Sequence, residues 1–136
     1  SGYKPIYSKK EQNFKLGKIE TFGNEKLNKI ILRNIKSTEK TNKKNAKIFN
    51  LEINTKLEKN VKSKDTKGNP NKFEIKIFTS LIVNKGSDKA LQKSFNISNI
   101  YNVFESEFEQ NKYEKKIERT LISKISQKLI IYLQTL

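Results

Sequence analysis

Stretches of alternating apolar and polar residues, together with two stretches of helical spacing, define the elements that this sequence predicts. Residues 15–22 alternate over a short run that Gly23 and Asn24 interrupt, which indicates a first strand. Asn24 suits the N-cap of a helix, and the apolar residues after it recur on one side at helical spacing. These apolar residues are Leu27, Ile30, Ile31 and Ile35. The pattern predicts a helix that ends at about Ser37.

The middle of the chain predicts a strand meander. Residues 46–62 alternate strictly, so one side of this strand faces the core and the other faces solvent. The core-facing residues are Leu51, Ile53, Thr55 and Leu57. Turn-forming residues at 65–70 precede a second alternating run at 73–83, and together these segments predict a long antiparallel hairpin. A further turn at 84–88 leads to a fourth strand at 89–97, with Leu91, Phe95 and Ile97 toward the core.

The last third of the chain contains the strongest helical pattern. Ser106 and Glu109 have the spacing of a capping box, and the apolar residues that follow trace one stripe. The stripe consists of Ile117, Leu121, Ile125, Leu129, Tyr132, Leu133 and Leu136. Because this stripe must pack on the inward faces of the strands, we expect both helices on one face of the sheet. The sequence thus predicts an α+β two-layer sandwich, a single domain over residues 1–136, in the order strand, helix, strand, strand, strand, helix.

Composition predicts a thin core and a basic surface. Hydrophobic residues make up 34% of the chain and charged residues 32%, which suits elements buried on one face only. The formal net charge of +15 favours a polyanionic partner, such as nucleic acid, an anionic membrane or a phosphorylated glycolipid. Nearly all basic residues are lysines, with Arg33 and Arg119 as the two arginines. Since asparagine and isoleucine are also abundant, a biased genome composition is the alternative explanation of the lysine excess.

The residue types present argue against an enzyme. The chain has no cysteine and no histidine, which removes disulfides and the usual nucleophiles and transition-metal ligands. Phosphate-binding and hydrolase motifs are also absent from the sequence. Glu105, Glu107 and Glu109 could form an acid–base pair or a cation site, but carboxylates are typical of helix N-termini, where they complement the dipole. We therefore expect no enzymatic activity, no cofactor and no metal site.

Four lysines cluster around the predicted hairpin turn. Lys62, Lys64, Lys67 and Lys72 would concentrate positive charge at one end of the sheet. Ammonium groups on flexible stems suit phosphates without demanding a fixed geometry. A solvated loop that resists aggregation is the alternative interpretation.

Two segments carry a resemblance to a known family. The chain opens with Ser1, Gly2 and Tyr3, and it closes with a strand, the pair Tyr101–Asn102 and a long helix. In this it resembles LptE, the RlpB-like lipopolysaccharide-assembly lipoprotein of Gram-negative bacteria, whose mature members begin with an acylated cysteine. The resemblance implies a cysteine at the position of Ser1 in the native precursor, with residues 1–14 as an extended segment after the lipid anchor. No signal segment is visible, as expected of a trimmed mature form or of a cytoplasmic protein.

The resemblance also implies a function. It places the protein on the periplasmic side of the outer membrane, as a non-enzymatic plug of the LptD β-barrel that binds lipopolysaccharide and helps deliver it to the outer leaflet. Lys67, beside Gly68, matches the basic residue that binds lipopolysaccharide in the family; Lys64 and Lys72 flank it, and Lys112 matches a second basic position loosely. The residues implied to face the barrel are Asn50, Glu52, Asn54, Glu74 and Lys76. No nucleic acid is expected as partner, and the alternative is a basic cytoplasmic α+β domain that binds nucleic acid.

Overall fold

The computed structural model describes residues 14–39, 46–86 and 89–136 of the chain, and it has the predicted α+β fold. Four strands and two helices follow in the predicted order. Their bounds are β1 Phe14–Gly23, α2 Glu25–Thr38, β2 Lys47–Lys64, β3 Pro70–Asn84, β4 Leu91–Asn102 and α3 Glu107–Gln134. Phe14, the last residue of the expected N-terminal segment, is the first residue of β1 and is buried. Residues 1–13, including Ser1, lie outside the described part of the chain.

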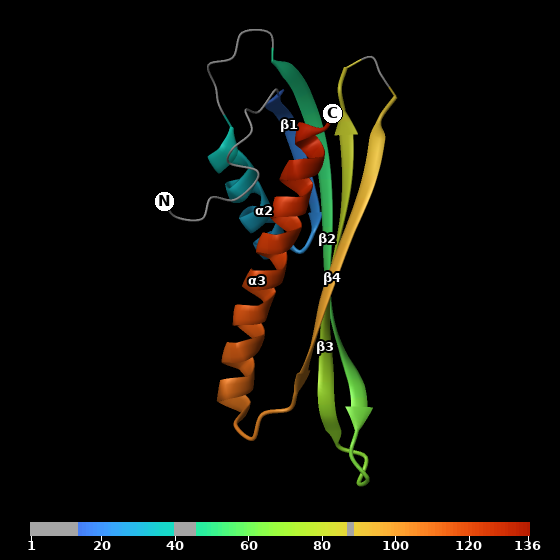
Figure 1. Cartoon of the computed structure of the whole chain (residues 1–136), viewed down its shortest axis with the longest axis vertical. Helices are drawn as coiled ribbons and strands as arrows, with labels where there is room; N and C mark the ends of the chain where they lie inside the picture. The colour runs from blue at the N-terminus through green and yellow to red at the C-terminus, as the bar shows by residue number, and fades with distance from the viewer. Residues whose placement is uncertain (1–13, 40–45, 87–88) are drawn as a thin grey trace.

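The strands form one sheet in the order β1-β2-β3-β4, an order that the sequence left open. β1 and β2 are parallel and are joined through α2, whereas β2, β3 and β4 form an antiparallel meander. Both helices pack on the same side of the sheet, as predicted (Figure 1). The other side, which we call the open face, is covered by no helix of the described chain (Figure 1).

The core lies between the sheet and the helices. Cross-strand partners such as Ile53 and Leu81 point toward the helices, because residues that alternate along a strand share a face. The largest fully buried aliphatic side chains include Leu27, Ile31, Ile35, Leu51, Ile53, Ile77, Leu81, Ile122, Ile125 and Leu129. In α3 the buried residues confirm the predicted stripe at Leu121, Ile125, Leu129 and Leu133.

Gly23 fixes the junction of β1 and α2. Its φ is +84°, and a Cβ there would lie 2.2 Å from the carbonyl oxygen of Thr55. Next to it, the Asn24 N–H donates to that same oxygen at 2.8 Å, and the Asn24 side chain accepts from the Leu27 N–H at 3.0 Å. The close approach requires glycine, and it places Asn24 as the predicted N-cap of α2.

The fourth strand is longer than predicted. It begins at Leu91 and continues to Asn102, so Tyr101 and Asn102 end a strand and do not form a turn. The alternation that predicts the strand breaks down in the added part, because the polar Asn99 faces inward beside Ile75 and the apolar Ile100 lies on the open face. β3 nevertheless pairs with it through Lys72↔Asn102, and the backbone ladder does not depend on side-chain polarity.

Candidate lysine-rich site at the hairpin end

Asp65 organises the turn between β2 and β3. Its carboxylate accepts from the backbone N–H groups of Lys67 and Asn69, both at 2.9 Å. Gly68 follows with φ +85°, and nothing lies within 4 Å of the position that a Cβ would occupy. The turn is therefore closed by its own backbone and one carboxylate, and the Lys67 side chain is left exposed beside Gly68.

Three of the predicted lysines lie at this hairpin end, and we call them the tip lysines. Lys64 ends β2, Lys67 is in the turn and Lys72 lies near the start of β3. All three are exposed, and within the described residues none of them forms an ion pair. The tip lysines thus form a small cluster of cations around the Asp65 carboxylate, which bonds to the backbone of the turn and forms no ion pair with them.

The lysines farther along the hairpin are partly neutralised. The Glu74 carboxylate lies 3.8 Å from the Lys62 ammonium and 3.6 Å from the Lys76 ammonium. Glu74 itself is buried on the open face although it was expected to be exposed. The structure therefore separates Lys62, which has an acidic partner, from the tip lysines.

Lys112 lies at the same end of the molecule but in the other layer. It is exposed on α3, whose first turns lie near the hairpin end (Figure 1). Lys72 shares the open face with Asn102, whereas Lys112 projects from the helix layer away from the sheet. Lys112 is thus not part of the tip cluster.

Exposed apolar side chains accompany the tip lysines. Ile100 is 51% exposed and Val103 is 44% exposed. Val103 donates its N–H to the carbonyl oxygen of Asn71, next to Lys72, at 3.0 Å. A shallow depression of about 400 Å³ lies here, lined by Ile100, Tyr101, Asn102, Val103, Phe104 and Tyr113. Positive charge and apolar surface therefore adjoin at one end of the protein.

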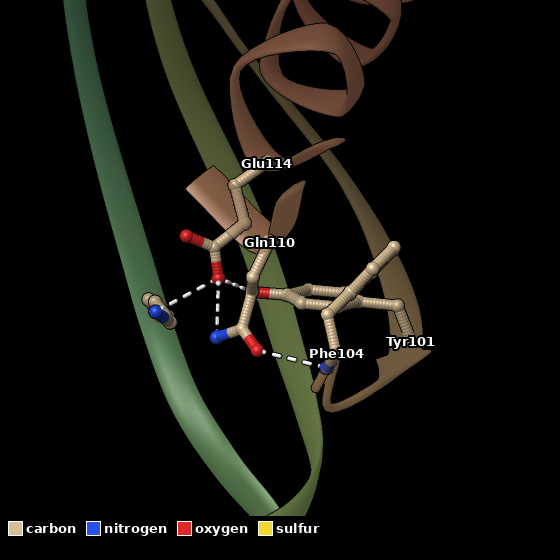
Figure 2. A network of polar contacts seen from close by, with 5 residues as sticks. Tyr101, Phe104, Gln110 and Glu114 are labelled. Atoms are coloured by element: carbon tan, nitrogen blue, oxygen red, sulfur yellow. Dashed lines mark hydrogen bonds and ion pairs between the residues drawn. The ribbon is translucent and has the colours of Figure 1, made fainter. Parts of the chain in front are cut away.

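A polar network behind this end joins α3 to the sheet, and the sequence analysis missed it. Glu114 accepts from the Tyr101 hydroxyl, from the Lys59 ammonium at 2.8 Å and from the Gln110 amide at 3.4 Å (Figure 2). Gln110 in turn accepts from the Phe104 N–H at 3.0 Å (Figure 2). These bonds fix the first half of α3 over β2 and β4.

Burial and hydrogen bonding compete in this network. Burial alone would raise the pKa of Glu114, but the hydrogen bonds from Lys59 and Tyr101 outweigh it and hold this pKa below its ordinary value. Burial, and then the bond to Glu114, raise the pKa of the Tyr101 hydroxyl well above its ordinary value. The network therefore keeps a carboxylate charged and a phenol neutral, which suits a structural clamp.

Two signals in the sequence could have revealed the network. Glu114 lies three residues before Ile117 and seven before Leu121, so a charge interrupts the apolar stripe of the helix. Lys59 continues the inward-facing series of its strand two residues after Leu57. A charge on each of two faces that must meet indicates an ion pair between the helix and the sheet.

The acidic residues before and within the first turn of α3 act as helix N-terminus residues. The Ser106 hydroxyl accepts from the Glu109 N–H at 3.2 Å, which confirms the predicted cap. Across the described ranges no group of three or more acidic residues is arranged to hold a metal ion. No helix among those ranges has the length and apolar composition to cross a bilayer.

Solved structures of bacterial lipoproteins share this fold. The rare lipoprotein B of Shewanella oneidensis matches with a TM-score of 0.69 at 11% identity, over 88% of this chain and 95% of its own. An uncharacterized lipoprotein B of Nitrosomonas europaea matches with a TM-score of 0.63 at 13% identity, over 98% of this chain and 91% of its own. A minor lipoprotein of Acinetobacter baumannii matches with a TM-score of 0.62 at 8% identity, over 87% of this chain and 91% of its own. No protein-family model and no curated protein sequence matches the chain, so the likeness is one of fold.

Proposed function

We propose that this chain is the periplasmic domain of a lipopolysaccharide-assembly lipoprotein of the LptE type. The finding that supports the proposal is the fold that the chain shares with lipoproteins B. One acyl-bearing residue would hold the domain at the periplasmic face of the outer membrane as an anchor and not as a span.

The observation that carries the proposal is the meeting of cations and apolar side chains at the hairpin end. Lipopolysaccharide presents phosphates beside acyl chains, and the tip lysines with Ile100 and Val103 offer a complement to each. The ammonium groups would compete with the divalent cations that bridge neighbouring glycolipids. The action is noncovalent: no bond is made or broken, and no catalytic group is required.

The open face is the proposed contact surface for the LptD barrel. Asn50, Glu52 and Asn54 of β2 are exposed there, and Lys76 of β3 is half-buried beside them. A large barrel has a polar lumen, which suits these polar residues, while Phe78 and Ile100, exposed on the same face, would need apolar contacts from the barrel.

The test is reversal of one charge at the hairpin tip. Lys67→Glu should weaken binding to purified lipopolysaccharide roughly tenfold, which corresponds to about 1.4 kcal/mol. The matched control is Lys89→Glu, an equal change at an exposed lysine before β4, at the other end of the sheet. Neither change touches the core, so both variants should keep the melting temperature within about 2 °C.

The outcomes separate three roles. Loss of binding in Lys67→Glu with normal binding in the control supports the tip site. Equal binding by all three proteins would remove Lys67 from the site. Association with LptD that survives without any lipopolysaccharide binding would indicate a chaperone of the barrel that does not handle lipid.

A further inference from the structure

The outward side of α2 is a row of basic residues. Lys26, Lys29, Arg33 and Lys36 follow one another at intervals of three or four residues, and all are exposed. Such spacing places them on one side of a helix, opposite the buried Leu27, Ile31 and Ile35. The row therefore points away from the sheet. Glu25 is the one acidic residue of this helix.

The first half of α3 carries a second row with the same outward direction. Lys112, Lys115, Lys116 and Arg119 are exposed, and their spacing of three, one and three residues keeps them on one side. The opposite side of this half contains Glu114, which is buried against the sheet. Glu107 and Glu109 in the first turn mark where the row ends.

The two rows belong to one face of the molecule. α2 lies beside the C-terminal half of α3 (Figure 1), where Asn34 lines a shared depression of about 210 Å³ with Ser123, Ser126, Gln127 and Ile130. The α3 row covers the half that α2 does not reach, so positive charge runs along most of the length of α3, about 40 Å. We call these eight residues together the outer helix face.

A general lysine excess does not explain this face. The ion pairs of the described residues all involve the sheet: Lys18–Glu20 on β1, Lys62 and Lys76 with Glu74, and Lys59 with Glu114. The open face also carries further glutamates, Glu52 and Glu58, among its lysines. None of the eight residues of the outer helix face takes part in these ion pairs, although α3 also contains four glutamates, so the face keeps its positive charge.

We propose that the outer helix face docks on an anionic phospholipid surface. One exposed ring, Phe108, lies on this side of α3 one turn before Lys112, whereas a base-stacking surface needs several rings. The six lysines of the face are point charges suited to mobile phosphates. The choice of lipid over nucleic acid rests on the proposed lipoprotein function, which holds the domain beside a bilayer. Docking would lay both helices along the leaflet and leave the open face free for a partner.

The first experiment measures binding of the soluble chain to vesicles of 30% phosphatidylglycerol and 70% phosphatidylcholine. The helix-face variant is Lys29→Gln/Arg33→Gln/Arg119→Gln, and the matched control neutralises the three tip lysines. Each basic residue near an anionic surface contributes about a factor of five, so the helix-face variant should bind about a hundredfold more weakly. The control should change by less than about fivefold, and vesicles of phosphatidylcholine alone should not bind the wild-type chain.

The second experiment reports orientation and does not depend on charge. The chain has no tryptophan, so one introduced residue is a unique fluorophore. Gln127→Trp places it on the exposed side of α3 near Ser123, and Asn96→Trp places it at an exposed position on the open face. Anionic vesicles should shift the tryptophan emission of Gln127→Trp to shorter wavelength and leave the emission of Asn96→Trp unchanged.

The proposal is overturned by any of three results. These are failure of the wild-type chain to bind anionic vesicles, equal losses in the two triple variants, or a shift at the open-face tryptophan alone. A nucleic-acid surface would be indicated instead if the wild-type chain bound duplex DNA tightly but did not bind vesicles, and if the helix-face variant lost the DNA binding. If the wild-type chain does not bind vesicles but Lys67→Glu still weakens lipopolysaccharide binding, the proposed function stands and the docking surface does not.

Discussion

The two halves of α3 are held against the rest of the molecule by different contacts. The C-terminal half buries the aliphatic residues Leu121, Ile122, Ile125, Leu129, Ile130 and Leu133, between the sheet and α2. In the N-terminal half the one buried residue is Glu114, which joins the polar network. Aromatic rings surround that network: Tyr113 lies 5.5 Å from Tyr101 and 5.1 Å from Phe104, measured between ring centroids.

This difference indicates a gradient of local stability along one helix. Burial of apolar area is the main favourable term in folding, so the C-terminal half should open only with global unfolding. The N-terminal half relies on fewer contacts, several of them polar, and should open at lower cost. The tip lysines and the exposed apolar residues lie at this less firmly packed end (Figure 1), as is common for sites that must adapt to a ligand.

The largest expected effect comes from the aliphatic half. Ile125→Ala removes a side chain that is 0% exposed, and it should lower the free energy of unfolding by about 2–5 kcal/mol. Ile117→Ala, the matched change at a partly buried position in the other half, should cost about 1 kcal/mol because less area and a smaller cavity are involved. Urea denaturation of both variants measures the contrast. Equal costs would show that the two halves do not differ in packing.

An intermediate effect is expected from the network. Glu114→Gln keeps the shape of the side chain but removes the charge that faces Lys59, and it should cost about 1–2 kcal/mol. The value is modest because the Lys59 side chain is 43% exposed and solvent screens the pair. Native-state hydrogen exchange should show faster exchange around Gln110 and Ile117 and little change near Leu129. Glu118→Gln, one turn away, is the control and should leave both regions protected.

The pH dependence of this effect follows from the direction of the pKa shift. The folded protein lowers the pKa of Glu114, so the stabilisation is fully present above the ordinary glutamate pKa of about 4.3 and is lost as pH falls through the lower folded value. The raised pKa of Tyr101 acts at the alkaline end of the pH range, where stability is lost as pH rises above about 10. The difference between wild type and Glu114→Gln should therefore be constant from pH 6 to 9 and shrink below about pH 4. A difference that grows in acid would contradict the assignment.

The same two halves show what the sequence could and could not predict. The caps at Asn24 and Ser106 and the stripe through Leu121 and Leu129 were predicted, because each depends on spacing within one segment. The grouping of the tip lysines was predicted for the same reason, since a hairpin brings sequence neighbours together. Strand order and the extension of β4 to Asn102 depend on pairing between segments, which periodicity within one segment does not encode.

The network was missed for a related reason. Its members Lys59, Tyr101 and Glu114 come from three elements, and each resembles an ordinary surface or core residue in its own segment. The outer helix face was likewise visible only after the buried side of each helix was known. A row of basic residues in a lysine-rich chain becomes informative when the structure shows that none of them is paired with a carboxylate of the described residues.

The smallest effect should distinguish the caps of the two helices. Asn24→Ala removes the side chain that accepts from Leu27, in a junction fixed by Gly23 and Thr55, and it should lower the global unfolding free energy by about 1 kcal/mol. Ser106→Ala removes the equivalent bond to Glu109 at the less packed end, and it should cost about 0.5 kcal/mol or less globally. Its effect should instead be local fraying, detected as faster amide exchange in the first turn of α3, because that turn can open without disturbing the aliphatic half. Were Ser106→Ala to cost as much in urea as Asn24→Ala, the first turn of α3 would have to unfold together with the core, and the gradient along this helix would be wrong.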